Sequence, residues 1–266
     1  MYHIVDSLYE LAIKQGVQFR WNTTIREILI KDKKAIAVRT SKQTIPFDKI
    51  ISDADAGYVS THLLKDHPLK SRLRKASLSS SALIFYWGIR KEFPQLDLHN
   101  ILFSGDYANE FRKIFKEKEI TKDPTIYIFI SSRMIPEDAP AGCENWFVMI
   151  NVPANQDQDW EKLIKEMRGH LIAKINRMLQ TDIEKYIEAE QVASPLTIQK
   201  NTNSLHGALY GSSSNSIFSA FLRHPNSLKE ISDLYFIGGS VHPGGGIPLC
   251  LASAKIVEQE IEQEHV

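Results

Sequence analysis

The chain has 266 residues, of which 43% are hydrophobic and 24% charged, with 32 basic and 32 acidic side chains. These proportions are typical of a globular protein, and a balanced charge with no run of lysine or arginine argues against nucleic acid as a partner. Only two cysteines occur, Cys143 and Cys250, so the sequence predicts neither a disulfide framework nor a zinc site.

The first third of the chain predicts a helix followed by short strands. Apolar residues at helical spacing over 2–15 precede Gly16, which favours an amphipathic helix with a glycine stop. Four β-prone runs then follow, and a polar turn leads into a predicted helical segment at 57–76. The four predicted strands are "VQFRWN" (17–22), "TIREILIKD" (24–32), "KAIAVRT" (34–40) and "TIPFDKIIS" (44–52).

The middle of the chain has longer aromatic and β-branched runs, which are typical of strands in a packed sheet. Helices are predicted at 106–118 and 158–180, and the apolar stripe of the second favours a core-facing helix over a ligand wall. The predicted strands are "SALIFYWGIR" (81–90), "NILFSG" (100–105), "TIYIFISS" (125–132) and "NWFVMINV" (145–152).

The C-terminal region predicts a strand, a glycine-rich loop and a helix in direct succession. The strand "LYFI" (234–237) runs into "GGSVHPGGG" (238–246), and "IPLCLASAKIVEQEIEQE" (247–264) has helical periodicity. Such an arrangement presents free N–H groups and the positive end of a helix dipole, and glycine lets backbone approach a ring or a diphosphate closely. The glycines alone would equally suit a tight structural turn, and no GxGxxG motif occurs in the chain.

The complete C-terminal sequence is more informative about function than its glycines alone. "LYFIGGSVHPGGGIPLCLASAKI" resembles the C-terminal signature of the bacterial phytoene desaturases, FAD-dependent carotenoid desaturases, including their hydroxyneurosporene dehydrogenase-like branch. "MYHIVDSLYELAIKQGVQF", "IISDADAGYVSTHLL" and "LHGALYGSSSN" are similar to further segments of that family. Because Met1 aligns with an internal methionine and the GxGxxG half is missing, the resemblance implies a C-terminal half of such an enzyme.

This resemblance implies an α/β fold, the C-terminal half of a two-domain, amine-oxidase-like flavoprotein. A partial FAD-binding domain is expected at 1–77 and again at 226–266, with a sheet-and-helix substrate-binding domain at 78–225 inserted between them. The implied function is FAD-dependent carotenoid desaturation. FAD is expected in the complete enzyme, whereas the fragment alone is expected to be inactive and to hold no tightly bound FAD, because the GxGxxG turn that anchors the pyrophosphate is missing.

The resemblance also assigns residues to the cofactor. The glycine loop and the helix after it are expected to face the flavin, where the helix dipole would stabilise negative charge on the reduced ring. Asp53 has an alternative as an ordinary turn former. The expected cofactor-binding residues are Ile25, Ser52, Asp53, Gly239, Ser240, Gly245, Gly246 and Ile247.

Three further residues have two interpretations each. His242 is a candidate catalytic base for the proton lost in desaturation, although a histidine in a glycine turn more often shapes the loop. His206 and Tyr210 are expected to border an apolar polyene channel; the alternative is a satisfied loop histidine and a half-buried tyrosine. No metal site is expected.

The expected partner is a carotenoid, and the expected location is the cytoplasm, at the inner face of the cell membrane. The mixture of aromatic and basic residues in "NEFRKIFKEKEI" (109–120) suits peripheral membrane contact, although a solvated helix with one packed face is the commoner explanation for so short a segment. An exposed face could also support a homodimer. Alternatives within the enzyme class are a retinol saturase, a carotene isomerase or an amine oxidase. Outside it, the alternatives are a flavin-free lipid or carotenoid carrier and a non-functional fragment.

Overall fold

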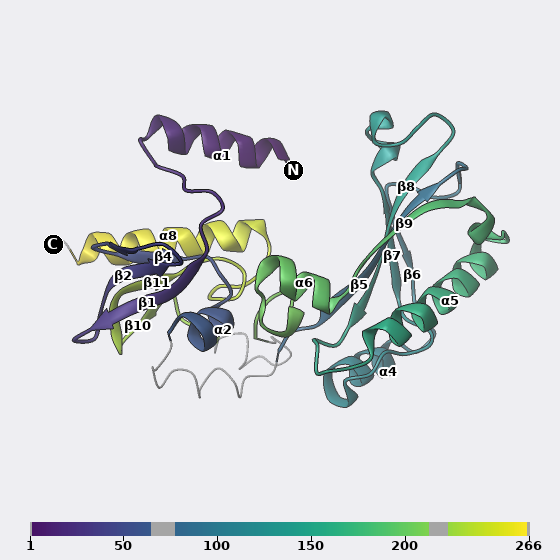
Figure 1. Cartoon of the computed structure of the whole chain (residues 1–266). Coiled ribbons are helices and arrows are strands. Elements are labelled where there is room, and N and C mark those ends of the chain that lie inside the picture. The colour runs from purple at the N-terminus through teal and green to yellow at the C-terminus, as the bar shows by residue number, and fades with distance from the viewer. Residues whose placement is uncertain (1, 65–77, 213–222, 265–266) are drawn as a thin grey trace.

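The computed structural model describes residues 2–64, 78–212 and 223–264, which form two sheets with helices packed on them (Figure 1). The helices are α1 (Tyr2–Lys14), α2 (Ala56–Tyr58), η1 (Val59–Leu63), α4 (Tyr107–Arg112), η2 (Lys113–Glu117), η3 (Ser131–Arg133), η4 (Pro136–Asp138), α5 (Trp160–Leu179), η5 (Ile183–Tyr186), α6 (Pro195–Thr202), η6 (Leu205–Gly207) and α8 (Ile247–Gln263). The strands are β1 (Ile25–Lys31), β2 (Lys34–Thr40), β3 (Thr44–Pro46), β4 (Ile50–Ser52), β5 (Ser81–Ile89), β6 (His99–Leu102), β7 (Ile126–Ile130), β8 (Glu144–Val152), β9 (Ile187–Ala193), β10 (Ser227–Leu228) and β11 (Ile231–Phe236).

The six-stranded sheet joins the two ends of the sequence. Its strands run in the order β1-β2-β11-β10, with β3 paired to β2 and β4 paired to β11. The pairing of β11 with β4 is parallel and sets Tyr235 opposite Ile51 and Phe236 opposite Ser52. The strand predicted at 234–237 is therefore confirmed in β11, and its Tyr235 and Phe236 lie beside a strand of the first segment. The domain boundaries themselves stay a prediction.

The five-stranded sheet is antiparallel and forms the larger core. Its order is β6-β7-β8-β5-β9, and α5 covers one face (Figure 1). Alternate residues of β5, β7 and β8 point toward α5 and are buried, as the pattern of the long strands requires. Trp87, Trp146 and Leu171 all belong to this cluster. Helix α5 is thus a core helix, as its stripe predicts.

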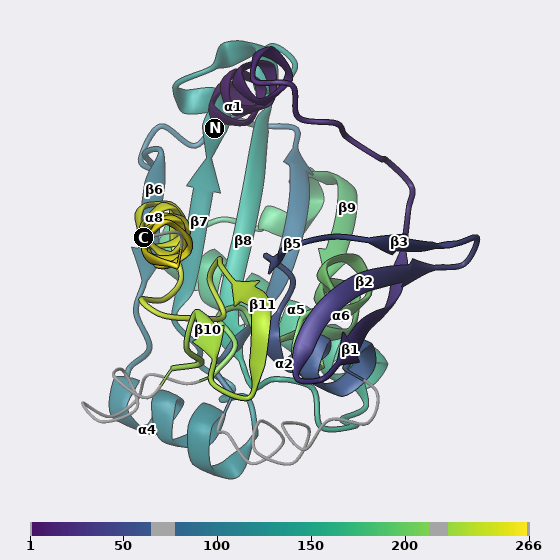
Figure 2. The ribbon, with the colours of Figure 1, turned by 90° about the vertical axis from the view of Figure 1, so that its left-hand side faces the viewer.

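The opposite face of this sheet is turned toward the six-stranded sheet. Figure 2 shows α8, β10 and β11 in front of the strands, whereas α5 lies behind them. Residues on this face, such as Tyr86 and Phe147, are exposed or half-buried. β11 therefore lies on the side of the five-stranded sheet that α5 does not cover.

Helix α1 stands apart from both sheets in Figure 1, and none of its residues is buried. The predicted strand 17–22 that follows is wrong: it has no strand partner among the described residues, and Phe19 and Trp21 instead stack at 5.4 Å. Leu8 and Leu11 are 51% and 52% exposed. Helix α1 therefore exposes apolar side chains.

Two other predicted segments differ in detail. The run 44–52 is split into β3 and β4, because Pro46 cannot continue a hydrogen-bonded ladder. The helix predicted at 57–76 begins as α2 and continues as a π-helical turn over 59–63, and most of the remaining part lies outside the described residues. The helix predicted at 106–118 is confirmed as α4 followed by η2.

A charged cluster ties β11 to α8 at the end remote from the glycines. The Lys49 amine donates to Asp233 at 3.0 Å and to the Tyr235 hydroxyl at 3.2 Å, and it also pairs with Glu264. The hydrogen bond to Glu264 raises the pKa of Lys49 above its usual value. Burial alone would raise the pKa of Asp233, but Lys49 and Lys34 lower it below its ordinary value. These contacts fix the direction in which α8 leaves the sheet.

Candidate functional site

The candidate site lies where β4 and β11 end side by side. After β11, the N–H of Ile237 donates to the carbonyl of Ser52 at 2.9 Å, so the parallel pairing continues to the last residue of β4. Both strands then turn into loops at the same edge of the sheet. This edge, at the carboxyl ends of parallel strands, is where open α/β sheets bind ligands.

The glycine loop (238–246) folds back on itself above this edge. The N–H of Gly238 donates to the Ser253 hydroxyl at 2.8 Å, which donates in turn to the carbonyl of Cys250 in α8 at 2.7 Å. A methyl group added at Gly239 would lie 3.4 Å from Cα of Gly245. The two arms of the loop are therefore close enough for such a methyl group to make van der Waals contact with the opposite arm.

Gly246 provides an open approach to the start of α8. Its φ of +104° is one that residues with a side chain rarely adopt, and no atom lies within 4 Å of an added methyl group. It is the N-cap of α8, and no side chain caps the helix. The N–H groups of Ile247 and Leu249 and the positive end of the helix dipole thus face an open position, which favours a negatively charged or electron-rich group.

Four of the expected cofactor residues meet at the base of the loop. Ser240 Oγ accepts from the N–H of Ala56 at 3.1 Å, and a methyl group on Gly238 would lie 3.4 Å from the carbonyl oxygen of Asp53. The turn-forming role belongs to Asp55, which caps α2 by accepting from the N–H of Tyr58 at 3.0 Å. The side chain of Asp53 is exposed beside the loop. Ser52, Asp53, Gly239 and Ser240 are therefore brought together.

The ring of Tyr210 packs against the glycine loop. A methyl group on Gly245 would lie 2.1 Å from Cδ1 of the Tyr210 ring, so the ring rests directly on this glycine. The ring is 46% exposed, and the N–H of Tyr210 donates to Ser79 Oγ at 3.0 Å. The residue expected at the substrate channel thus contacts a residue expected at the cofactor.

His206 and Ile25 are not in contact with the loop. His206 is exposed, in a left-handed conformation with φ +55°, and its carbonyl accepts from the N–H of Asn155 at 2.8 Å. Ile25 begins β1 opposite Thr40, at the end of β2, and packs against the core of the six-stranded sheet. Neither residue has a contact that tests its expected role.

His242 is held by its backbone, and its ring is exposed. Its N–H donates to the carbonyl of His224 at 3.0 Å, and its carbonyl accepts from Asn226 Nδ2 at 3.0 Å. Asn226 is buried and also donates to the carbonyl of Phe236 at 2.9 Å, so it clamps β11 to the glycine loop. Through these contacts the backbone of His242 helps to hold the conformation of the loop.

Arg223 is a site residue that the sequence reasoning missed. Its guanidinium donates to the carbonyls of Tyr210 at 3.2 Å and of Gly239 at 3.1 Å, and it lies against Gly244. Burial lowers the pKa of this guanidinium below its usual value. Arg223 and Asn226 belong to "RHPNS", a polar run just after the Ser/Asn-rich stretch. An arginine and an asparagine between a polar stretch and a buried strand are the signal that could have identified them.

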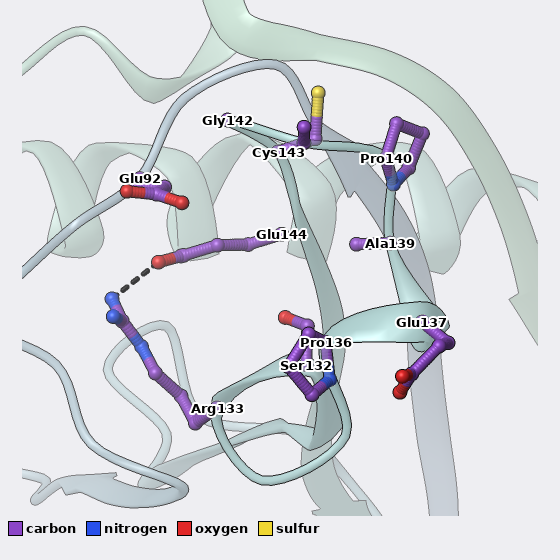
Figure 3. Close-up of a pocket in the computed structure, with 11 residues that line it drawn as sticks. Glu92, Ser132, Arg133, Pro136, Glu137, Ala139, Pro140, Gly142, Cys143 and Glu144 are labelled. Carbon is purple, nitrogen blue, oxygen red and sulfur yellow. Dashed lines mark hydrogen bonds and ion pairs between the residues drawn. The ribbon is translucent and has the colours of Figure 1, made fainter.

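A hollow of about 330 Å³ lies elsewhere, beside the connection from β7 to β8 (Figure 3). Arg133 pairs there with Glu144, which is 3% exposed and also accepts from the N–H of Phe93 at 2.9 Å and from Trp146 Nε1 at 2.7 Å. None of the expected site residues lines this hollow. Its polar groups stabilise the end of the sheet.

Relatives of the chain are carotenoid-modifying proteins. It is 52% identical over 256 residues to the 1-hydroxycarotenoid 3,4-desaturase of Flavobacterium sp. (strain P99-3), covering 96% of this chain and 52% of that protein. It is 32% identical to the phytoene desaturase of Fusarium fujikuroi, covering 97% of this chain and 50% of that protein. The chain belongs to the carotenoid desaturase family. It spans about half the length of the curated relatives it matches. No protein-family profile matches it.

A further relative and a solved structure are also similar to this chain. The 4,4'-diapolycopene oxygenase of Methylomonas sp is 30% identical, covering 98% of the chain and 53% of that protein. An oxidoreductase from Methanosarcina mazei superposes with a TM-score of 0.61 at 13% sequence identity, over 96% of this chain and 53% of that one. The likeness shows a shared fold, and the expected α/β fold class is confirmed.

Proposed function

We propose that this chain forms the flavin-ring and substrate half of an FAD-dependent carotenoid desaturase. The observation that carries the proposal is the glycine loop at the ends of β4 and β11, with an open Gly246 and an uncapped α8 behind it. The family and the 52% identity to a 1-hydroxycarotenoid 3,4-desaturase support the reaction. We infer a linear carotenoid with a hydroxylated end as the substrate class.

The residues present fit the ring end of FAD. At Gly246 an added methyl group would meet nothing, and at Gly239 the backbone can be approached closely because no side chain intervenes. Gly245 and Ile247 would lie beside the ring, and Ser52, Asp53, Ser240 and Ile25 would lie toward the rest of the cofactor. FAD, when bound, supplies the acceptor for the hydride removed from the carotenoid.

The chain's own residues would act on the reaction through charge and position. The first turn of α8 and the guanidinium of Arg223, which lies against Gly244, favour negative charge at the loop. Tyr210 covers Gly245 and would separate the ring edge from the polyene. His206 would border the polyene farther from the loop.

Desaturation also releases a proton. His242 is the residue of the loop whose imidazole could accept this proton, but both of its backbone groups are engaged in holding the loop. We propose that His242 shapes the loop and that His242→Ala retains flavin and part of the turnover. Retained flavin with complete loss of turnover would instead assign it as the base.

No helix of the described chain is long and apolar enough to cross a bilayer. Contact with a membrane surface is proposed near α4, where Phe103 and Tyr107 are 66% and 53% exposed. Ile114 is buried and Phe111 half-buried, so part of the expected lipid-facing segment packs inward. Co-sedimentation with anionic vesicles, weakened in a Phe103→Ser, Tyr107→Ser variant, would test this contact. A cytoplasmic location follows as part of the same proposal.

The function is tested with a fusion protein. This chain is joined in one polypeptide to the first half of the Flavobacterium relative, which is the part that this chain does not match. The fusion is expected to bind FAD and to convert a 1-hydroxycarotenoid to a product that absorbs at longer wavelength, because one conjugated double bond is added. Bound FAD without any change in the carotenoid spectrum would contradict the reaction. No observation of the site favours a retinol saturase, a carotene isomerase, an amine oxidase or a flavin-free carrier.

A further inference from the structure

The open face of the five-stranded sheet carries an unusual row of side chains. Cross-strand neighbours place one aromatic ring on each of four adjacent strands, each directly opposite the next. We call these residues the aromatic row: Tyr86 on β5, Phe147 on β8, Phe129 on β7 and His99 on β6. Gln191 on β9 pairs with Tyr86 and ends the row on the other side.

Two neighbouring pairs of rings within the row are in contact. Tyr86 and Phe147 meet edge to face at 5.5 Å, and His99 stacks on Phe129 at 5.2 Å. Since neighbouring strands lie about 4.8 Å apart, four strands give the row a length of about 14 Å. A groove of about 510 Å³ runs over its Tyr86, Phe147 and Phe129 part. The row is therefore a long aromatic surface and not an isolated pair.

The row and the row next to it carry no charged side chain, and Glu190, which also lines the groove, is paired with Arg168. The adjacent row of cross-strand partners contains Ile84, Met149, Tyr127 and Ile101, so neither row includes Asp, Glu, Lys or Arg. A surface with this composition disfavours charged ligands, whose desolvation would not be compensated there, and favours a flat apolar one. A linear conjugated chain matches it in shape and in polarity.

One end of the row carries a hydrogen-bonded pair. His99 Nδ1 lies 2.7 Å from the hydroxyl oxygen of Tyr127, and the two rings stack at 6.0 Å. If Tyr127 donates in this bond, His99 Nε2–H remains a donor and the phenol oxygen an acceptor. If His99 donates, the phenol O–H remains a donor and Nε2 an acceptor. Either tautomer can therefore satisfy both the donor and the acceptor of an alcohol.

We propose that a linear polyene lies along the aromatic row and that His99 and Tyr127 bind its hydroxylated end. This inference rests on the proposed function and adds to it the residues that select the hydroxyl group. An alcohol buried on an apolar surface without a partner is costly, so the pair favours the hydroxylated polyene over the same chain without the group.

The experiment measures binding to the whole chain, without FAD. A linear 1-hydroxycarotenoid and its counterpart lacking the hydroxyl are titrated in dilute detergent, and quenching of tryptophan fluorescence is followed. Trp87 and Trp146 lie on strands of the same sheet and report the bound polyene. The wild-type chain is expected to bind the hydroxylated polyene about tenfold more tightly, the effect of one or two well-formed hydrogen bonds.

The variants separate the two parts of the proposal. His99→Phe and Tyr127→Phe keep the rings and are expected to reduce the preference to below about twofold, with binding of the other polyene unchanged. Gln191→Leu, at the opposite end of the row, is the matched control and is expected to keep the preference. Phe147→Ala is expected to weaken binding of both polyenes. Circular dichroism confirms the fold of each variant.

Three results would overturn the inference. Equal binding of both polyenes by the wild-type chain would remove the hydroxyl assignment while leaving the proposed function intact. Loss of the preference in Gln191→Leu but not in His99→Phe would place the hydroxyl at the other end. Failure of the wild-type chain to bind either polyene would contradict both this inference and the substrate part of the proposed function.

Discussion

The two sheets differ in how completely the chain covers them. Around the five-stranded sheet, α5 and the strands bury a core that includes Trp87, Trp146 and Leu171, each at most 1% exposed. Beside the six-stranded sheet, α1 buries none of its residues, and Leu249 and Leu251 of α8 are 41% and 55% exposed. One face of the first region is stabilised by its own packing, whereas its opposite face and, in the second region, α8 and the glycine loop remain available for contacts with other groups.

A large loss of stability is expected when the Arg133–Glu144 ion pair at the end of the five-stranded sheet is broken. Arg133→Met leaves the buried Glu144 carboxylate without its cation and should lower the free energy of unfolding by about 3 kcal/mol, the low end of the range because Arg133 is partly exposed. Urea unfolding followed by tryptophan fluorescence measures it. Adding Glu144→Gln should recover part of the loss. Equal stability of the wild-type and Arg133→Met proteins would show that this pair does not stabilise the sheet.

A matched pair of leucines tests the comparison directly. Leu171 is fully buried and Leu8 is 51% exposed. Leu171→Ala should cost about 2–5 kcal/mol because it leaves a cavity, whereas Leu8→Ala should change stability by less than about 0.5 kcal/mol. Similar losses for both variants in the same urea titration would mean that α1 packs on the chain in solution.

A smaller change in stability is expected when the pH is lowered. Burial lowers the pKa of His224 below its usual value, against the opposing hydrogen bond to the carbonyl of Pro225. Because the folded chain disfavours protonated His224, its contribution to stability is present above the unfolded pKa of about 6.5 and is lost as pH falls through the folded value. The midpoint of thermal unfolding should therefore fall less between pH 8 and pH 5 in His224→Gln than in the wild type. Parallel curves would refute this role.

The long strands were largely predictable because they are runs of aromatic and β-branched residues. β5, β7 and β8 are such runs, and the helical stripe of α5 is long enough to be distinct. The segment 17–22 has the composition of a strand, but a strand requires a partner and none of the described strands pairs with it. β9 was missed because Glu188 and Glu190 on this edge strand hide its alternation.

The site was predictable only where one continuous stretch of sequence forms it. The order of strand, glycines and helix indicated the loop and α8 directly. The contact of Tyr210 with Gly245, and the hydrogen bonds of Arg223 and Asn226 to the loop, depend on packing between segments that are separate in sequence. Composition carries no information about such contacts.

The central claim is that the glycine loop faces a flavin ring, and one pair of variants tests it most directly. Gly246 and Gly142 both have positive φ and open space around an added methyl group, but only Gly246 lies in the loop. Each is changed to Val in the fusion with the first half of the Flavobacterium relative, and flavin per polypeptide is measured by absorbance after gel filtration. We predict that Gly246→Val lowers flavin affinity at least about tenfold, because a side chain fills the space through which the ring approaches. Gly142→Val is expected to leave the flavin content unchanged. Equal flavin content in the two variants would contradict it.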